Sequence, residues 1–88
     1  MRHAGPAILK KIEILLGAIR TLPNLKEKSR GVFYRRSKAF LHFHEDPNGI
    51  FADMRPREAW ERFDISSNAQ QKLFLGELRL KLNFKDHQ

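Results

Sequence analysis

The strongest structural signal in this sequence is the segment Asp46-Pro47-Asn48-Gly49, which separates two runs rich in aromatic and β-branched residues. Its aspartate can cap a turn, its proline presets a backbone angle that turns use, and its glycine tolerates a positive φ at the exit. The flanking runs, 39–45 and 50–55, have the composition of strands. The sequence therefore predicts an antiparallel hairpin, whose apolar face needs a second layer to cover it.

An amphipathic helix is predicted before this hairpin. Between Pro6 and Leu22, apolar residues recur at helical spacing, with polar residues mainly on the opposite side. Pro6 suits the first turn of a helix, and Pro23 ends it. The apolar stripe, which we expect to cover the sheet, consists of Ile8, Leu9, Ile12, Leu15, Leu16 and Ile19.

Two further strands are predicted on either side of the hairpin. The polar and basic segment 24–30 has no periodicity, which predicts a loop ending at Gly31. Residues 32–36 are rich in strand-forming types and predict a strand, and the alternation over 61–65 fits a fourth one.

The C-terminal part predicts a helix. Ser67 and Gln70 have the spacing of a capping box, in which two side chains satisfy the first backbone amides of a helix. Residues 78–85 also alternate in a way that fits a strand, but we favour the helix. The predicted fold class is therefore α+β: one domain over residues 1–88, with an N-terminal helix, an antiparallel β-meander of three to four strands and a C-terminal helix.

The hairpin also predicts which side chains share a face, because residues directly opposite each other in an antiparallel pair point the same way. The expected pairs are Glu45 with Ile50, His44 with Phe51, His42 with Asp53 and Phe40 with Arg55.

The turn before the hairpin extends these pairs into rows. A two-residue turn at Ser37-Lys38 would place Phe33 opposite His42 and Arg35 opposite Phe40. One face would then carry rings interleaved with cations, and the other face would carry an apolar set for the first helix to cover: Val32, Tyr34, Leu41, Phe43, Ile50, Ala52 and Met54.

The positive charge is concentrated in one segment. The net charge is +7, and residues 20–38 hold seven basic residues against the single acidic residue Glu27. Such a basic pole attracts anionic partners such as nucleic acid, although cations on an edge strand also serve solubility and deter strand pairing. The candidate anion-binding residues are Arg30, Arg35, Arg36, Lys38 and Arg55.

Aromatic residues offer two further hypotheses. Phe33, Phe40 and Phe51 would hold the bases of a single-stranded nucleic acid if exposed. If covered, as we favour, they would lie under the C-terminal helix or form a homodimer face against a second copy. Trp60, the only tryptophan, lies between charged neighbours and would be either a lid on the core or, if exposed, an interaction site.

A weaker candidate is a metal or acid–base site. His42 and His44 leave the same side of a strand, and Asp53 faces them, so that two imidazoles and a carboxylate would meet. A structural hydrogen bond between histidine and aspartate explains the same pattern more simply. No nucleophile motif accompanies the three residues, and the sequence favours neither an enzyme nor a cofactor.

Composition excludes some classes of protein and argues against others. The chain has no cysteine, which excludes disulfides and thiolate zinc sites. No apolar run approaches the length of a membrane span, and the first residues lack the apolar core of a signal peptide. These features predict a cytoplasmic protein without a membrane partner.

A resemblance adds to these predictions. Through the segments Leu22-Pro23, 31–34, 38–43, 49–53 and Arg62-Phe63, the chain resembles a small family of uncharacterised bacterial proteins, over most of residues 19–78. It is also similar to the MmcQ/YjbR-like domains, in which a leucine-proline turn leads from the first helix into an antiparallel sheet. This resemblance implies DNA binding, which has been suggested for those domains from their shape, and implies no catalytic residues.

The leading hypothesis from sequence is a non-enzymatic module that binds nucleic acid or another anionic macromolecule through its basic sheet edge. The alternatives are a homodimer or protein-interaction domain that uses the phenylalanine face, and a small metal-dependent or acid–base enzyme at the two histidines and Asp53.

Overall fold

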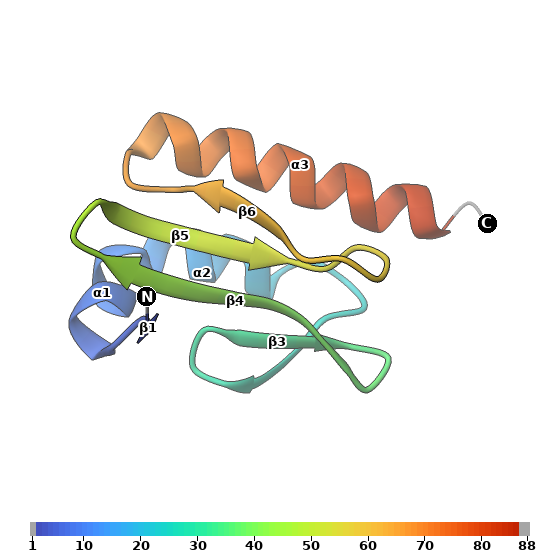
Figure 1. Ribbon diagram of the computed structural model, residues 1–88. Coiled ribbons are helices and arrows are strands. Elements are labelled where there is room, and N and C mark those ends of the chain that lie inside the picture. The colour runs from blue at the N-terminus through green and yellow to red at the C-terminus, as the bar shows by residue number, and fades with distance from the viewer. Residues whose placement is uncertain (1, 87–88) are drawn as a thin grey trace.

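The protein is an α+β domain in which helices pack on an antiparallel sheet, as the sequence predicted (Figure 1). The computed structural model describes the backbone of residues 2–86 and the side chains of residues 4–82. Its helices are α1 (Pro6–Lys11), α2 (Glu13–Arg20) and α3 (Asn68–Asp86). Its strands are β1 (Arg2–His3), β2 (Lys26–Ser29), β3 (Val32–Arg35), β4 (Lys38–Asp46), β5 (Gly49–Met54) and β6 (Glu61–Asp64).

The sheet has more strands than the three to four expected. Its order is β2-β3-β4-β5-β6, and the two-residue β1 pairs with the C-terminal part of β4. The prediction of a loop over 24–30 was wrong, because residues 26–29 form β2. This strand contains no apolar residue and lies at the edge of the sheet, where it needs no buried face, so hydrophobic patterning gives no sign of it.

The central hairpin is confirmed. Asp46 pairs with Gly49, and the Asp46 side chain accepts a hydrogen bond of 2.7 Å from the backbone N–H of Asn48, as a capping aspartate should. The register between β4 and β5 matches the predicted one, with His42 opposite Asp53 and His44 opposite Phe51.

The predicted register between β3 and β4 was wrong. The turn lies at Arg36-Ser37, one residue earlier than expected, and both residues have positive φ, 52° and 71°. Positive φ at both central residues is the geometry of the tight hairpin turns that match strand twist.

A bulge follows this turn. Tyr34 pairs with Ala39 and Phe33 with Leu41, so Phe40 is an extra residue on β4 without an opposite on β3. Phe33 therefore shares a face with Leu41 rather than with His42, and Val32 and Tyr34 lie on the other face from Phe33.

One core joins the helices to the sheet. Leu41 lies opposite Met54, Phe43 lies opposite Ala52, and all four are buried against the helices, which confirms that part of the predicted apolar face. Five of the six residues of the predicted helix stripe are buried, namely Leu9, Ile12, Leu15, Leu16 and Ile19, whereas Ile8 is only partly buried. A break at Ile12 divides the expected single helix into α1 and α2. Phe74, Leu78 and Leu82 of α3 complete the core.

The helix α3 begins with the predicted capping box. The Gln70 side-chain oxygen accepts from the Ser67 N–H at 2.9 Å, and the Ser67 hydroxyl accepts from the Gln70 N–H at 3.2 Å. Residues 78–85, for which a strand was the alternative, are helical. Within the described part of the chain, no helix has both the length and the apolar character needed to cross a bilayer.

Candidate functional site

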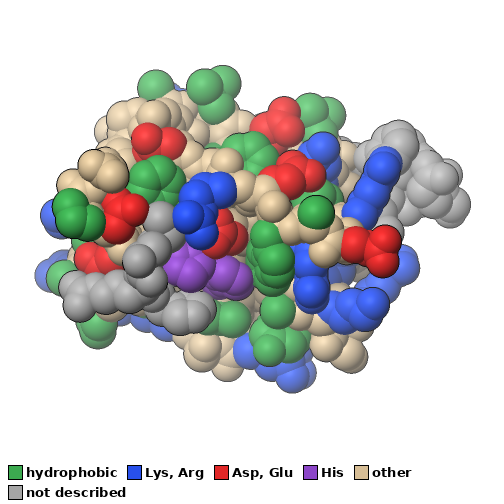
Figure 2. Space-filling view, in the orientation of Figure 1, with side chains coloured by type: hydrophobic (Ala, Val, Ile, Leu, Met, Phe, Trp, Pro, Cys, Tyr) green, Lys and Arg blue, Asp and Glu red, His purple; other side chains and the backbone are tan. Residues whose placement is uncertain are grey.

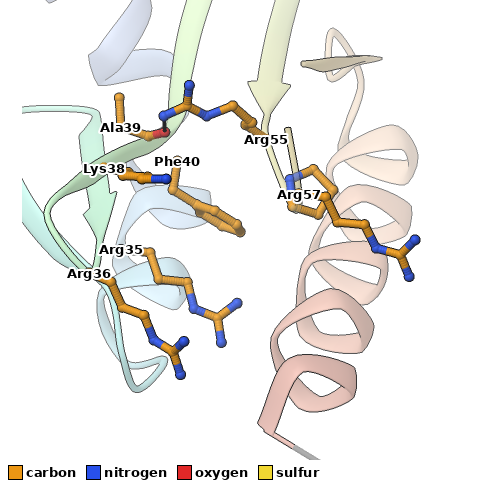
Figure 3. Close-up of a pocket in the computed structure, with 8 residues that line it drawn as sticks. Arg35, Arg36, Lys38, Ala39, Phe40, Arg55 and Arg57 are labelled. Atoms are coloured by element: carbon orange, nitrogen blue, oxygen red, sulfur yellow. Dashed lines mark hydrogen bonds between the residues drawn. The ribbon is translucent and has the colours of Figure 1, made fainter. Parts of the chain in front are cut away.

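Five basic residues are among those that line one pocket of about 220 Å³ at the end of the sheet where β3, β4 and β5 meet (Figure 3). The guanidinium of one of them, Arg57, points away from the others (Figure 3). Arg35, Arg36 and Lys38 come from the β3–β4 turn, and Arg55 and Arg57 follow β5. Ala39, Phe40 and Pro56 complete the lining. Four of the five candidate anion-binding residues lie here, and we refer to this site as the basic pocket.

Strand register brings these residues together. Because β4 and β5 are antiparallel, the first residues of β4 lie beside the residues that follow β5, and the backbone N–H of Arg55 donates to the carbonyl of Phe40 at 2.8 Å. The Arg55 guanidinium turns back across the strand, and its Nη2 donates to the Ala39 carbonyl at 2.7 Å (Figure 3). Arg55 is thus held in place on the pocket wall.

Arg35 is the most enclosed cation of the pocket. It is 7% exposed, and its guanidinium carbon lies 5.8 Å from the centre of the Phe40 ring. A guanidinium tolerates such a site better than an ammonium, since it is more weakly hydrated and packs against rings. The bulge at Phe40 places this ring beside Arg35.

A second basic hollow adjoins the basic pocket. It has a volume of about 350 Å³ and is lined by Lys26, Lys28 and Tyr34, among others, and by Arg36, which also lines the basic pocket. The Lys28 ammonium lies 5.3 Å from the centre of the Tyr34 ring. The two hollows therefore share one lining residue, Arg36.

One of the predicted anion-binding residues lies away from the two hollows, and three basic residues that were not predicted line them. Arg30 lines neither hollow and instead lies 3.6 Å from the Glu13 carboxylate. Arg57 was not predicted, although a basic residue two positions after Arg55 was a usable signal. Lys26 and Lys28 were missed because their segment was interpreted as a loop.

The predicted aromatic face was wrong. Phe33 and Phe40 are 1% and 3% exposed and belong to the core, whereas Phe51 lies opposite His44 on the other side of the sheet. The physical reason is the bulge, which shifts the register of β3 and turns Phe40 into the core. The homodimer alternative therefore loses the surface that was assigned to it.

The two histidines and Asp53 lie together on the sheet face opposite the core (Figure 2). Asp53 is 5% exposed, and Arg62, directly opposite it on β6, donates to both its oxygens at 2.7 and 2.8 Å. His44 Nε2 lies 2.9 Å from Oδ2 of the same carboxylate. We refer to His42, His44, Asp53 and Arg62 together as the carboxylate network.

The network explains the titration of Asp53. Burial by itself raises the pKa of this carboxyl, but the hydrogen bonds from Arg62 and the charges of His44, Arg62 and His42 outweigh it, so that the pKa of Asp53 is lowered. The candidate ligand atoms of His42, His44 and Asp53 lie within 4.8 Å of one another. A metal there would compete with Arg62 for both carboxylate oxygens, and the metal site stays a prediction.

Trp60 lies between the network and the basic pocket. Its ring is 42% exposed, which makes it the most exposed aromatic side chain of residues 4–82. The Arg55 guanidinium carbon lies 4.9 Å from the centre of the indole, and the His42 ring centre lies 4.5 Å from it. Trp60 is thus half-buried, its ring contacts Arg55 and His42, and its role stays a prediction.

Comparisons with known proteins give no match: no protein-family model, curated protein or solved structure is similar to this chain. The resemblance to the MmcQ/YjbR-like domains therefore stays a prediction.

Proposed function

We propose that this domain binds nucleic acid by holding successive backbone phosphates in the basic pocket and in the adjoining hollow. The observation that supports this most is the shared residue Arg36, which makes the two cationic hollows neighbours. A polymer with regularly repeated phosphates can fill both hollows, whereas a small anion can fill only one.

The chemistry of the lining fits phosphate. Five of the eight residues that line the basic pocket carry a positive charge, and none of the lining residues of either hollow is acidic. Arginine offers several N–H donors in a planar fork that suits phosphate oxygens, and each neutralised phosphate releases counterions, which favours binding. Pockets for small organic ligands are lined mainly by apolar side chains, so this lining favours an anion.

The positions of the cations support backbone contacts rather than base reading. Arg36 and Lys38 are exposed at a turn, and Arg55 is anchored to a backbone carbonyl. Contacts to phosphates fix the position of a nucleic acid without distinguishing its sequence.

The test is a titration of labelled oligonucleotides at several salt concentrations. We expect micromolar or tighter binding at low salt and a slope of log K against log salt of about −3 for single strands, which corresponds to about four neutralised phosphates. Absence of binding at 50 mM salt would reject the proposal.

A matched pair of variants locates the site. Lys38→Gln with Arg57→Gln removes two charges from the basic pocket, and Lys10→Gln with Arg30→Gln removes two charges from residues that line neither hollow. We expect the first variant to bind at least about tenfold more weakly and the second to stay close to the wild type. Equal weakening of both would show that only net charge matters and would contradict a defined site.

A further inference from the structure

We infer that Trp60 is a base-stacking platform beside the basic pocket, so that the nucleic acid bound there is single-stranded. This inference rests on the proposed function, because it requires a phosphate in the basic pocket. The observation behind it is the contact of one residue, Arg55, with both the pocket and the indole.

The position of the ring meets the requirements of a platform. Trp60 lies in the segment that joins β5 to β6, a few residues beyond the pocket residues Pro56 and Arg57. Its indole packs on His42 and Arg55 while 42% of the residue stays open to solvent. A ring that packs on neighbouring side chains and keeps part of its surface open to solvent offers area on which a base can stack.

The support of the ring is itself fixed. The Arg55 guanidinium is tied to the Ala39 carbonyl, and His42 lies on β4, opposite the buried Asp53. An aromatic side chain that is held in its bound position loses little conformational freedom when a ligand arrives.

Charge and stacking would then act on adjacent parts of one nucleotide. Figure 2 shows, on one face of the molecule, the histidines and the adjoining hydrophobic surface with basic side chains on either side. A phosphate held by Arg55 and its neighbours places the attached sugar and base next to the indole. Stacking requires an unpaired base, which a duplex does not offer without opening.

The chain offers a direct probe, since Trp60 is its only tryptophan. We expect a single-stranded oligothymidylate to quench the intrinsic fluorescence of the wild type along the same curve that anisotropy of the labelled strand reports. A duplex of the same length and inorganic polyphosphate should bind more weakly or without this quenching. Polyphosphate serves as the control because it carries repeated charges but no bases.

Variants separate stacking from charge. Trp60→Leu should weaken single-strand binding by about tenfold and leave the salt slope unchanged, since it removes a stacking surface and no phosphate contact. Trp60→Phe should recover part of the loss, because it restores a ring. Urea denaturation of both variants checks that the fold is retained.

The outcomes distinguish the stacking role of Trp60 from the phosphate site on which it rests. Salt-dependent binding of the wild type with no fluorescence change, and with Trp60→Leu equal to the wild type, would overturn the stacking role and leave the phosphate site intact. No binding of any polyanion at low salt would overturn both. Equal affinity for single strand and duplex would overturn the single-strand preference.

Discussion

The basic pocket and the carboxylate network differ in one buried carboxylate, although both contain residues of β4 and of β5 or the segment directly after it. In the network, the Asp53 carboxylate accepts two hydrogen bonds from Arg62 and lies 2.9 Å from His44 Nε2. In the pocket, the lining residues include five cations and no acid. The comparison teaches that cations of one sheet can have different surroundings: Arg62 contacts a buried carboxylate, whereas the lining of the basic pocket contains no acidic residue.

The largest effect is expected on stability, when the buried carboxylate of Asp53 is removed. Asp53→Asn keeps the shape of the side chain but leaves Arg62 and His44 without a charged acceptor. We expect the free energy of unfolding to fall by about 1–3 kcal/mol, because a buried site loses charge-assisted hydrogen bonds. Urea denaturation measures the fall. Oligonucleotide affinity should not decrease. A decrease in a variant that keeps its fold would show that the carboxylate network and the basic pocket are coupled.

The pH dependence of stability gives a second test of the role of the Asp53 carboxylate. The pKa of Asp53 is lower in the folded protein than its ordinary value, so the unfolded chain takes up a proton at higher pH than the folded one. The stabilisation is therefore present above the unfolded pKa of about 3.9 and is lost as the pH falls through the folded pKa. Denaturation of wild type and Asp53→Asn between pH 7 and pH 2 should show their difference shrinking below about pH 4. A constant difference would contradict the assignment.

A smaller effect on stability is expected in the basic pocket, whose lining contains no acidic residue. Arg36→Gln removes the cation shared by the two hollows, and we expect binding to weaken about fivefold, with the salt slope reduced by about one. Stability should change by less than about 0.5 kcal/mol, since Arg36 is exposed. Anisotropy at three salt concentrations and urea denaturation provide the two measurements. A large loss of stability would show that Arg36 supports the turn rather than a ligand.

The smallest effect is expected at Arg30. It lies 3.6 Å from Glu13 and lines neither hollow, and both partners are about half exposed, 44% and 46% for their side chains. An exposed ion pair of this kind contributes little, so Arg30→Gln should change neither affinity nor stability by more than about 0.5 kcal/mol. The same two assays apply. Weakening comparable to that of Arg36→Gln would extend the site toward Arg30.

Much of the fold could be predicted from local patterns. The central hairpin and its register depend on the aspartate, proline and glycine of its turn together with the alternation beside it, and the C-terminal helix begins at a recognisable capping box. In each case the interacting groups are close in sequence, so the residues alone carry the information. The pairing of His42 with Asp53 follows from the same register.

The arrangement of residues at the basic pocket could be seen only in the tertiary structure. The position of the Arg36-Ser37 turn and the bulge at Phe40 depend on how the core accepts Phe33, Phe40 and Leu41 at once. One residue of shift in a strand exchanges its two faces, so the choice between a buried ring and an exposed one is made by packing across the sheet. For the same reason, the chain's cations were evident from composition, but their arrangement into a pocket with Arg57 and beside Trp60 was not.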